Sequence, residues 1–354
     1  MKCFPAGSIH AHPAWFGSVM GTAALSVVLF NEGQTWQAAW LDPIAAALLI
    51  AATCLAVALI PRYARRVFHP EALRLEIADP STGPMLGTLP AGTLLLGVAW
   101  GVVGPLVVGR TIALWLDAVL LLIGIIFALA LSITWVALTI RAEVELASVN
   151  GGWLIPPLMN LLVPLAIAPL AFANPSDAAA LLMIGLAFLG IGAFLFLAVF
   201  TLIFARLATC PPASGSAAPS LWIPLAPAGL LGVATLRLLQ AGVSSGLWDP
   251  QFVLIGLGIA VMGIGFGLWW AALALVELRR LRRSGGVPFH IGWWSFVFPT
   301  AAMALSIGAV GDATGLMPVK VMGALAAFTL VCVWAMVATR TLLAAVGQRM
   351  HDAA

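Results

Sequence analysis

The chain of 354 residues is 62% hydrophobic and 8% charged, whereas soluble domains are about a quarter charged. No soluble fold can bury so much apolar surface, so the composition excludes a soluble globular protein and indicates a polytopic membrane protein. The net charge of +3 favours no particular partner.

Ten segments are long and apolar enough for a transmembrane helix, which needs about 20 residues. In chain order they are 14–30, 40–60, 84–105, 111–139, 153–173, 178–206, 221–244, 251–278, 288–311 and 317–346. We predict an all-α membrane protein in which ten helices form a single domain over residues 1–354. The N-terminal stretch shows no clear cleavage site, so we expect the first segment to be retained.

The basic residues predict the orientation of these segments. With ten spans, thirteen of the sixteen basic residues fall on one side: Lys2, Arg62, Arg65, Arg66, Arg74, Arg141, Arg206, Arg279, Arg280, Arg282, Arg283, Arg340 and Arg349. The positive-inside rule therefore predicts that both termini are cytoplasmic. Arginine outnumbers lysine fourteen to two, which with the abundant alanine and glycine is typical of a bacterial protein, so we expect a bacterial plasma membrane.

The odd-numbered segments begin at regular intervals of about 69 residues. A fixed period of this kind predicts five repeated helical hairpins. Ten similar helices joined by short loops would also be evenly spaced, so spacing alone leaves both interpretations open.

Proline and glycine separate the odd segments from the even ones. The odd segments carry interior residues that disfavour a regular helix: Gly17 and Gly21, Pro90, Pro156, Pro157 and Pro164, Pro224 and Pro227, and Pro299. An interior proline costs about 3 kcal/mol, and the carbonyl that it frees cannot face lipid. We therefore predict kinked odd helices around a central pore, with the even helices as an outer ring against lipid.

The odd segments contain hydroxyl groups and no aspartate or glutamate. Cation pathways usually show acidic rings, whereas anion pores favour basic residues and helix N-termini, so this pattern favours an anion. The candidate anion contacts are Ser18, Thr22, Thr88, Ser295 and Arg237. Arg237 lies near the end of its segment, so its side chain reaching the membrane interface is an alternative interpretation.

The remaining candidates for chemistry are sparse. Asp117 lies inside the fourth segment. A role in proton coupling and a role in pairing with another group near the membrane interface are both open interpretations. Pairing is favoured, because Asp117 lies only seven residues after Arg110, near one end of the segment. His10 and His12 form an HxH pattern that is a weak metal signal by itself, and the four cysteines are widely spaced. The glycines of segment 251–278 follow no strand and indicate close helix packing rather than a nucleotide loop.

These observations predict no metal, no cofactor, no nucleic-acid partner and no enzymatic activity. A membrane-embedded enzyme is the rival from another class, and it would need acid–base or metal ligands clustered at one membrane face.

Five motifs in chain order suggest a family: "PAWFGSVMGTAALS", "ADPSTGPMLGTLPAG", "WLIPP", "LWIPLAPAG" and "GWWSFVFP". Together they resemble the tellurite-resistance/dicarboxylate transporter family, which includes bacterial tellurite-resistance proteins, fungal malate permeases and sulfite pumps, and plant slow anion channels. The resemblance implies five hairpins around a pore, commonly a homotrimer with one pore per subunit, and a pore-occluding phenylalanine in the ninth helix. The last motif places that residue at Phe298, with Phe296 as the second candidate. The chain departs from the pattern at Asp79-Pro80, where many relatives have His-Pro.

The expected function is transport of a small anion across a lipid bilayer through the central pore. A malate-like C4-dicarboxylate is the first expected substrate. Efflux of sulfite or a tellurite-type oxyanion, or an inorganic anion channel, are the alternatives.

Overall fold

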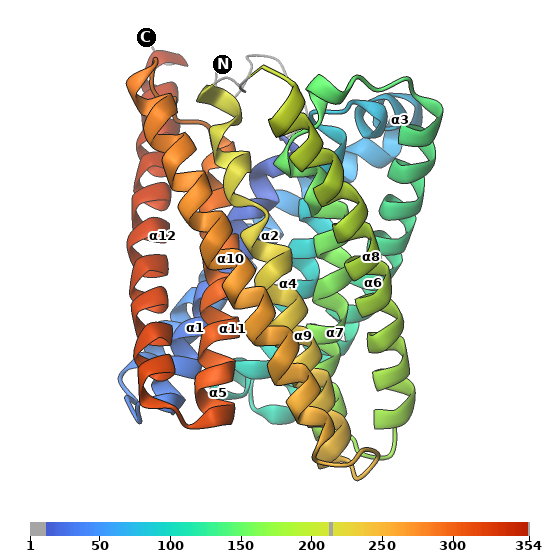
Figure 1. Cartoon of the computed structure of the whole chain (residues 1–354), viewed down its shortest axis with the longest axis vertical. Coiled ribbons are helices and arrows are strands. Elements are labelled where there is room, and N and C mark those ends of the chain that lie inside the picture. The colour runs from blue at the N-terminus through green and yellow to red at the C-terminus, as the bar shows by residue number, and fades with distance from the viewer. Residues whose placement is uncertain (1–11, 212–214, 353–354) are drawn as a thin grey trace.

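The computed structural model describes residues 12–211 and 215–352, and within these ranges it contains helices and no strands. Ten helical stretches are long and apolar enough to cross a membrane, which confirms the predicted ten-helix membrane protein. They run roughly along the long axis of the molecule (Figure 1). Lys2, Cys3 and His10 lie outside the described residues.

The odd spans each combine a short 3-10 segment (η) with the α-helix that follows it. Their bounds are η1(Pro13–Trp15) with α1(Phe16–Thr35), η3(Gly83–Gly87) with α4(Thr88–Val102), η5(Gly151–Leu154) with α7(Ile155–Ala173), η6(Gly215–Trp222) with α9(Leu225–Ser244), and η7(Ile291–Phe296) with α11(Val297–Thr314). Between 72% and 94% of the most apolar window in each is buried. We refer to these five as the inner helices.

The even spans are uninterrupted α-helices, only 22–28% buried over the same kind of window. Their bounds are α2(Leu41–Ala64), α6(Arg110–Arg141), α8(Ala178–Thr209), α10(Phe252–Arg283) and α12(Met317–Asp352). Short elements complete the chain: η2(Arg65–Phe68), α3(Pro70–Ala78), α5(Pro105–Val108) and η4(Leu146–Ser148). The exposed faces of the five long helices are apolar, as a lipid-facing surface requires.

The inner helices close into a ring. Along the chain, α1 packs against α4, α4 against α7, α7 against α9 and α9 against α11, and α11 returns to α1. Each outer helix packs on the inner helix that precedes it, so α2 lies on α1, α6 on α4, α8 on α7, α10 on α9 and α12 on α11. That these five pairs are copies of one repeated unit stays a prediction.

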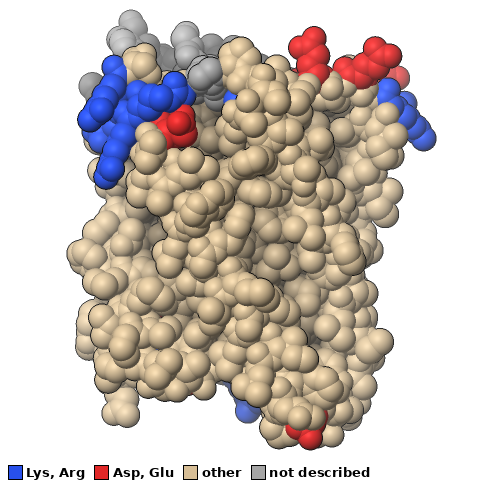
Figure 2. All heavy atoms as spheres, viewed as in Figure 1, with Lys and Arg blue, Asp and Glu red and all other residues tan. Residues whose placement is uncertain are grey.

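Charged side chains gather at the two ends of the bundle, with an uncharged band between them (Figure 2). We call the end at which α2, α6, α8 and α10 finish the arginine-rich end, because it carries Arg62, Arg65, Arg66, Arg74, Arg141, Arg206, Arg279, Arg280, Arg282 and Arg283. Which side of a membrane this end faces stays a prediction.

Four of the prolines lie at the start of their α-helices instead of in the interior, whereas Pro164 lies inside α7 as the sequence suggested. Pro90, Pro157, Pro227 and Pro299 each occupy the third position of an α-helix, directly after the 3-10 segment or the turn that ends it. The first amides of an α-helix have no partner within it, so a proline there does not carry the cost of an interior one. In α geometry the ring would clash with the carbonyl four residues earlier, which explains why the preceding turn is a 3-10 turn.

The two glycines of α1 lie where neighbouring elements pack closely, and a kink of α1 at either of them stays a prediction. A Cβ atom on Gly17 would lie 3.2 Å from the Cβ of Trp294, and one on Gly21 would lie 2.8 Å from Cγ1 of Val297. Their absence of side chains therefore lets α1 approach η7 and α11, which closes the inner ring.

Candidate functional site

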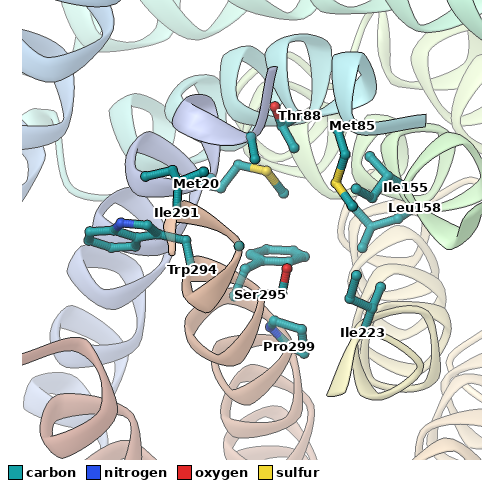
Figure 3. Close-up of a pocket in the computed structure, with 14 residues that line it drawn as sticks. Met20, Met85, Thr88, Ile155, Leu158, Ile223, Ile291, Trp294, Ser295 and Pro299 are labelled. Carbon is teal, nitrogen blue, oxygen red and sulfur yellow. The ribbon is translucent and has the colours of Figure 1, made fainter. Parts of the chain in front are cut away.

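A small cavity lies inside the inner ring, in its half nearer the arginine-rich end (Figure 3). All five inner spans contribute to its lining, with Ala14, Gly17, Met20, Met85, Thr88, Ile155, Leu158, Ile223, Ile291, Gly292, Trp294, Ser295, Phe298 and Pro299. Its volume of about 40 Å³ leaves space for a water molecule or two. Apart from the hydroxyls of Thr88 and Ser295 and the indole of Trp294 the lining is apolar, and we call this space the pore cavity.

Phe298 is a buried aromatic residue in the wall of the pore cavity. It occupies the second position of α11, immediately before Pro299, and only 3% of its surface is exposed. The change from 3-10 to α geometry at this point fixes the direction in which the ring enters the cavity. Phe296 differs, because its ring packs against Trp222 and Trp293 and does not line the cavity.

Three of the five inner spans begin with the same kind of cap. A side-chain atom accepts a hydrogen bond from the amide two residues later, with Ala14 bonding to His12 (3.2 Å), Gly152 to Asn150 (2.8 Å) and Gly292 to His290 (3.1 Å). Asp79 accepts a bond of the same kind from the Ser81 amide (2.9 Å), but in the loop before η3, whose cap residue Thr82 makes no such bond. Such caps satisfy amides that a helix start leaves open. Asp79, which departs from the His-Pro pattern, therefore makes the same local bond that His12 makes before Pro13.

Burial keeps the two histidine caps in their accepting form. It lowers the pKa of both His12 and His290 below the ordinary value. Nε2 of His290 lies 2.9 Å from the Ser216 carbonyl, so this nitrogen carries the proton and Nδ1 is free to accept. For Asp79, burial acts to raise the pKa, but hydrogen bonds from Thr82 and Ser81 outweigh it and hold the pKa below its usual range.

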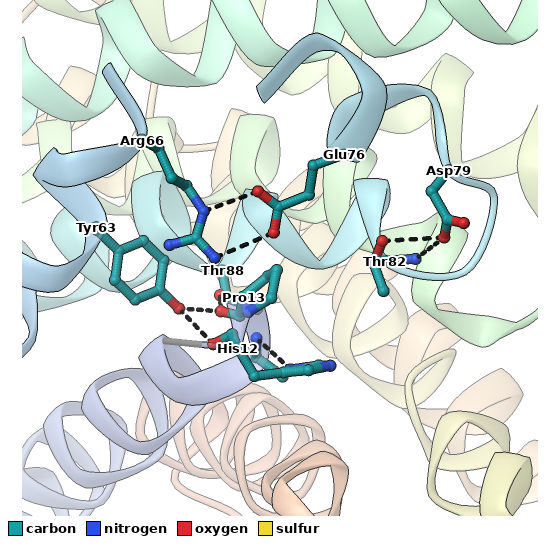
Figure 4. Close-up of polar contacts among 9 residues, drawn as sticks. His12, Pro13, Tyr63, Arg66, Glu76, Asp79, Thr82 and Thr88 are labelled. Carbon is teal, nitrogen blue, oxygen red and sulfur yellow. Dashed lines mark hydrogen bonds and ion pairs between the residues drawn. The ribbon is translucent and has the colours of Figure 1, made fainter. Parts of the chain in front are cut away.

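A set of polar contacts fastens the start of α1 beside the pore cavity (Figure 4). The Pro13 carbonyl accepts hydrogen bonds from the hydroxyls of Tyr63 and Thr88, the latter at 2.8 Å. Arg66 stacks 4.8 Å over the Tyr63 ring and forms a two-point ion pair with Glu76 at 2.8 and 3.0 Å. These contacts tie η1, α2, α3 and α4 together, and sequence reasoning identified neither Tyr63 nor Glu76.

The predicted anion contacts divide into two groups. Thr88 and Ser295 line the pore cavity. Ser18 and Thr22 do not, because Ser18 donates to the Trp15 carbonyl and Thr22 accepts from the indole of Trp334 on α12. Neither Ser18 nor Thr22 lines the pore cavity, and a contact of either residue with an anion stays a prediction.

Arg237 lines a second cavity at the opposite end of the bundle, between α1, α9 and α11. Its guanidinium donates to Gln240 at 3.2 Å, and the cavity wall also holds Glu32 and Asp312. Those two carboxylates accept hydrogen bonds from Trp36 and Thr35, at 2.9 and 2.8 Å. Arg237 therefore faces a space within the protein, and two acids offset its charge.

Helical periodicity connects the two cavities. On α1, steps of three or four residues lead from Met20 through Ala24 to Asn31, and on α11 Leu305 lies two turns beyond Phe298. Residues at such spacing share one face of a helix. The same faces therefore line both cavities, and between them fully buried apolar side chains such as Ala24 fill the ring.

Asp117 is buried in α6 without a partner, which contradicts the predicted pairing. Its carboxyl group is fully buried, and neither oxygen has a hydrogen-bond partner. The group occupies a notch in α4, where a Cβ atom on Gly101 would lie 2.4 Å from Oδ2 and one on Gly97 would lie 3.0 Å from Oδ1. The notch lies between α4 and α6, outside the pore cavity.

Comparison with known proteins assigns the family. The model of a family described as voltage-dependent anion channel, SLAC1, matches residues 10–342. A Methanocaldococcus jannaschii protein described as an uncharacterized transporter is 25% identical over 83% of this chain and 82% of its own length. A protein of Arthroderma otae named a sulfite efflux pump is 26% identical over 92% of this chain and 88% of its own, and one of Trichophyton rubrum with that name is 25% identical over the same shares.

These matches confirm the family resemblance inferred from the five inner-helix motifs. Because the family match spans nearly the whole chain and all ten spans, the protein belongs to the SLAC1 family of voltage-dependent anion channels and is an anion transporter or channel of that family.

Proposed function

We propose that small anions pass along the axis of the inner ring and that Phe298 closes this path at the pore cavity. The observation that carries the proposal is the pore cavity itself: all five inner spans line it, none of the described residues in its wall is acidic, and Phe298 forms part of that wall. Hydrophobic constrictions of this kind can close a pore by excluding water. The passage requires no covalent step and no bound cofactor.

We propose a compact oxyanion of the sulfite type as the substrate. Among the described residues that line the pore cavity, Ser295 has the hydroxyl that is free to donate, because Thr88 already donates to the Pro13 carbonyl, and none is cationic. The cavity can therefore solvate one small charged group better than two separated carboxylates. The names of the fungal relatives point in the same direction. A malate-like dicarboxylate, which the motif resemblance favoured, remains the second candidate, with the hydroxyl of Ser295 as its first contact; Thr88 could serve only after releasing the Pro13 carbonyl.

At the opposite end, we propose that Arg237 favours anions over cations at the mouth of the path. Glu32 and Asp312 line the same cavity and reduce its attraction, so a weak and readily reversed interaction is expected. An anion can leave the path only if its binding at this mouth is weak.

The decisive experiment is flux into proteoliposomes that contain the purified protein. We expect Phe298→Ala to raise anion flux about tenfold or more, which corresponds to a barrier lower by about 1.4 kcal/mol. Sulfite, malate, succinate, nitrate and chloride, each with and without a pH gradient, would identify the preferred anion and any proton coupling.

Phe296→Ala is the matched control, because it removes the same side chain two residues away and outside the pore cavity. We expect its flux to stay near that of the unchanged protein. Equal flux in a folded Phe298→Ala variant and the parent would contradict the gate, and flux of cations in place of anions would contradict the proposed function.

We further propose that the protein resides in a bacterial plasma membrane with its arginine-rich end in the cytoplasm, and that it assembles as a homotrimer with one path per subunit. The distribution of arginine supports the orientation. The trimer comes from the family resemblance, and native mass spectrometry of the detergent-solubilised protein tests it.

A further inference from the structure

Two cavities near the arginine-rich end lie outside the pore and have volumes of about 250 and 470 Å³, compared with about 40 Å³ for the pore cavity. The smaller one lies between α8 and the segments 147–151 and 217–224, and the larger one lies between α8 and α10. Part of the yellow inner span between these two outer helices is visible in Figure 1. The two cavities share Arg206, Leu207, Leu221 and Trp270 as lining residues, so they meet at a common wall.

Arg206 is an unpaired cation at this common wall. It lies on the buried face of α8 with only 9% of its surface exposed, and its guanidinium has no hydrogen bond and no ion pair among the described residues. Removing a charge from water without a partner is costly in a membrane protein, and such residues usually mark a binding site. An anion bound at this position would therefore supply the missing partner of Arg206.

The two cavities differ in character on either side of Arg206. The smaller one is lined by polar groups of the loops at this end, including Ser81, Ser148, Asn150 and Ser220. The larger one is mainly apolar, with Phe204, Leu207, Leu273, Ala274 and Leu281. The polar cavity and the apolar cavity therefore meet at the guanidinium of Arg206.

The other charges of the larger cavity neutralise each other. Glu277 and Arg280 form an ion pair with contacts of 2.8 Å, and no further acidic side chain lines either cavity within the described residues. No acidic side chain among the described lining residues is therefore left to pair with Arg206. Trp270, which donates to the Leu221 carbonyl at 2.8 Å, holds the rear wall in place.

The depth of Arg206 matches a lipid headgroup. It lies three residues before the end of α8, which is about 4.5 Å along the helix axis. We propose that this pair of cavities, the Arg206 site, binds an anionic phospholipid, with the phosphate on the guanidinium, the headgroup in the polar cavity and an acyl chain in the apolar one. Basic pockets between membrane helices recognise anionic lipids in this manner.

The test is native mass spectrometry of the purified full-length protein titrated with phosphatidylglycerol, and separately with phosphatidylcholine. We expect the protein to retain phosphatidylglycerol preferentially, and we expect Arg206→Gln to weaken this binding about fivefold or more. Arg282→Gln removes the same charge from an exposed position of α10 at the same end, so it should leave the binding unchanged.

A second variant covers the case in which Arg206→Gln fails to fold. Ala208 is exposed on α8 and lines the apolar cavity, so Ala208→Trp fills that space without disturbing the core and should also weaken phosphatidylglycerol binding. Unchanged binding in Arg206→Gln or in Ala208→Trp would overturn the proposal. Protection from thermal unfolding by inorganic phosphate equal to that by phosphatidylglycerol would overturn it too, because it would show a site for a free anion.

Discussion

His290 combines a capping bond with a titratable ring just before the segment that carries Phe298. Its Nδ1 accepts the Gly292 amide at 3.1 Å while Nε2 bonds to the Ser216 carbonyl. Protonation of Nδ1 would remove the acceptor and leave the Gly292 amide, in the first turn of η7, without its partner. The structure around this residue therefore favours the neutral ring.

We expect the free energy of unfolding to decrease as the pH falls from 7 toward 5.5. Burial lowers the pKa of His290 in the folded protein, whereas the unfolded chain titrates near about 6.5. Below that value the unfolded state binds more protons, so the stabilisation is present above about pH 6.5 and is lost as the pH falls through the folded pKa. Thermal unfolding in detergent at a series of pH values measures this loss.

His290→Asn isolates the contribution of this one ring. Asparagine keeps an acceptor for the amide two residues later, as Asn150 does at η5, but it does not titrate in this range. The variant should therefore show a flatter dependence of the melting temperature on pH than the unchanged protein. Equal slopes in the variant and the unchanged protein would show that His290 contributes nothing to the pH dependence.

At the scale of helices, the glycines of α10 separate into packed and open positions. A Cβ atom on Gly263 would lie 2.3 Å from the Ala228 carbonyl oxygen of α9, a backbone atom that cannot move aside. Gly258 and Gly265 have no neighbouring atom within 4 Å of such a Cβ. The glycine string therefore allows α10 to approach α9 along one face only.

Gly263→Ala should lower the free energy of unfolding by about 1–3 kcal/mol, because the two helices must separate to admit the methyl group. Gly265→Ala is the matched control on the same helix, and it should leave stability unchanged or raise it by up to about 1 kcal/mol through better helix propensity. Melting temperatures of the two purified variants distinguish the cases. A similar loss of stability in both would indicate a general sensitivity of α10 instead of a specific contact.

The amino-acid sequence predicted which helices lie inside the ring, but it could not predict the orientation of single side chains. Proline placement separated inner from outer helices, because a residue such as Pro299 reports local backbone geometry directly. The orientation of single hydroxyls was out of reach: α1 is apolar on all sides, so no pattern showed that Thr22 faces α12 while Met20 faces the pore cavity. The bond from Tyr63 to Pro13 joins residues 50 positions apart, and only the closed ring brings them together.

At the scale of the whole molecule, the distribution of arginine makes the two ends electrically different. Ten spans return the chain to the end from which it starts, so both ends of the described chain share the arginine-rich end (Figure 1). Basic residues flanking transmembrane helices remain preferentially on the cytoplasmic side of the membrane. One orientation in the cell is therefore expected for all ten helices together.

Single-cysteine labelling in intact cells tests this orientation, after the native cysteines have been replaced by serine. Ser176 lies in the exposed turn between α7 and α8 at the opposite end, and Ser284 is exposed just after α10 at the arginine-rich end. A membrane-impermeant maleimide should label Ser176→Cys and not Ser284→Cys, because only the first position would face the outside. Both variants should react once the cells are permeabilised, which shows that each thiol is accessible. Labelling of Ser284→Cys alone in intact cells would invert the orientation, and with it the assignment of Arg237 to the external mouth and of the Arg206 site to the cytoplasmic leaflet.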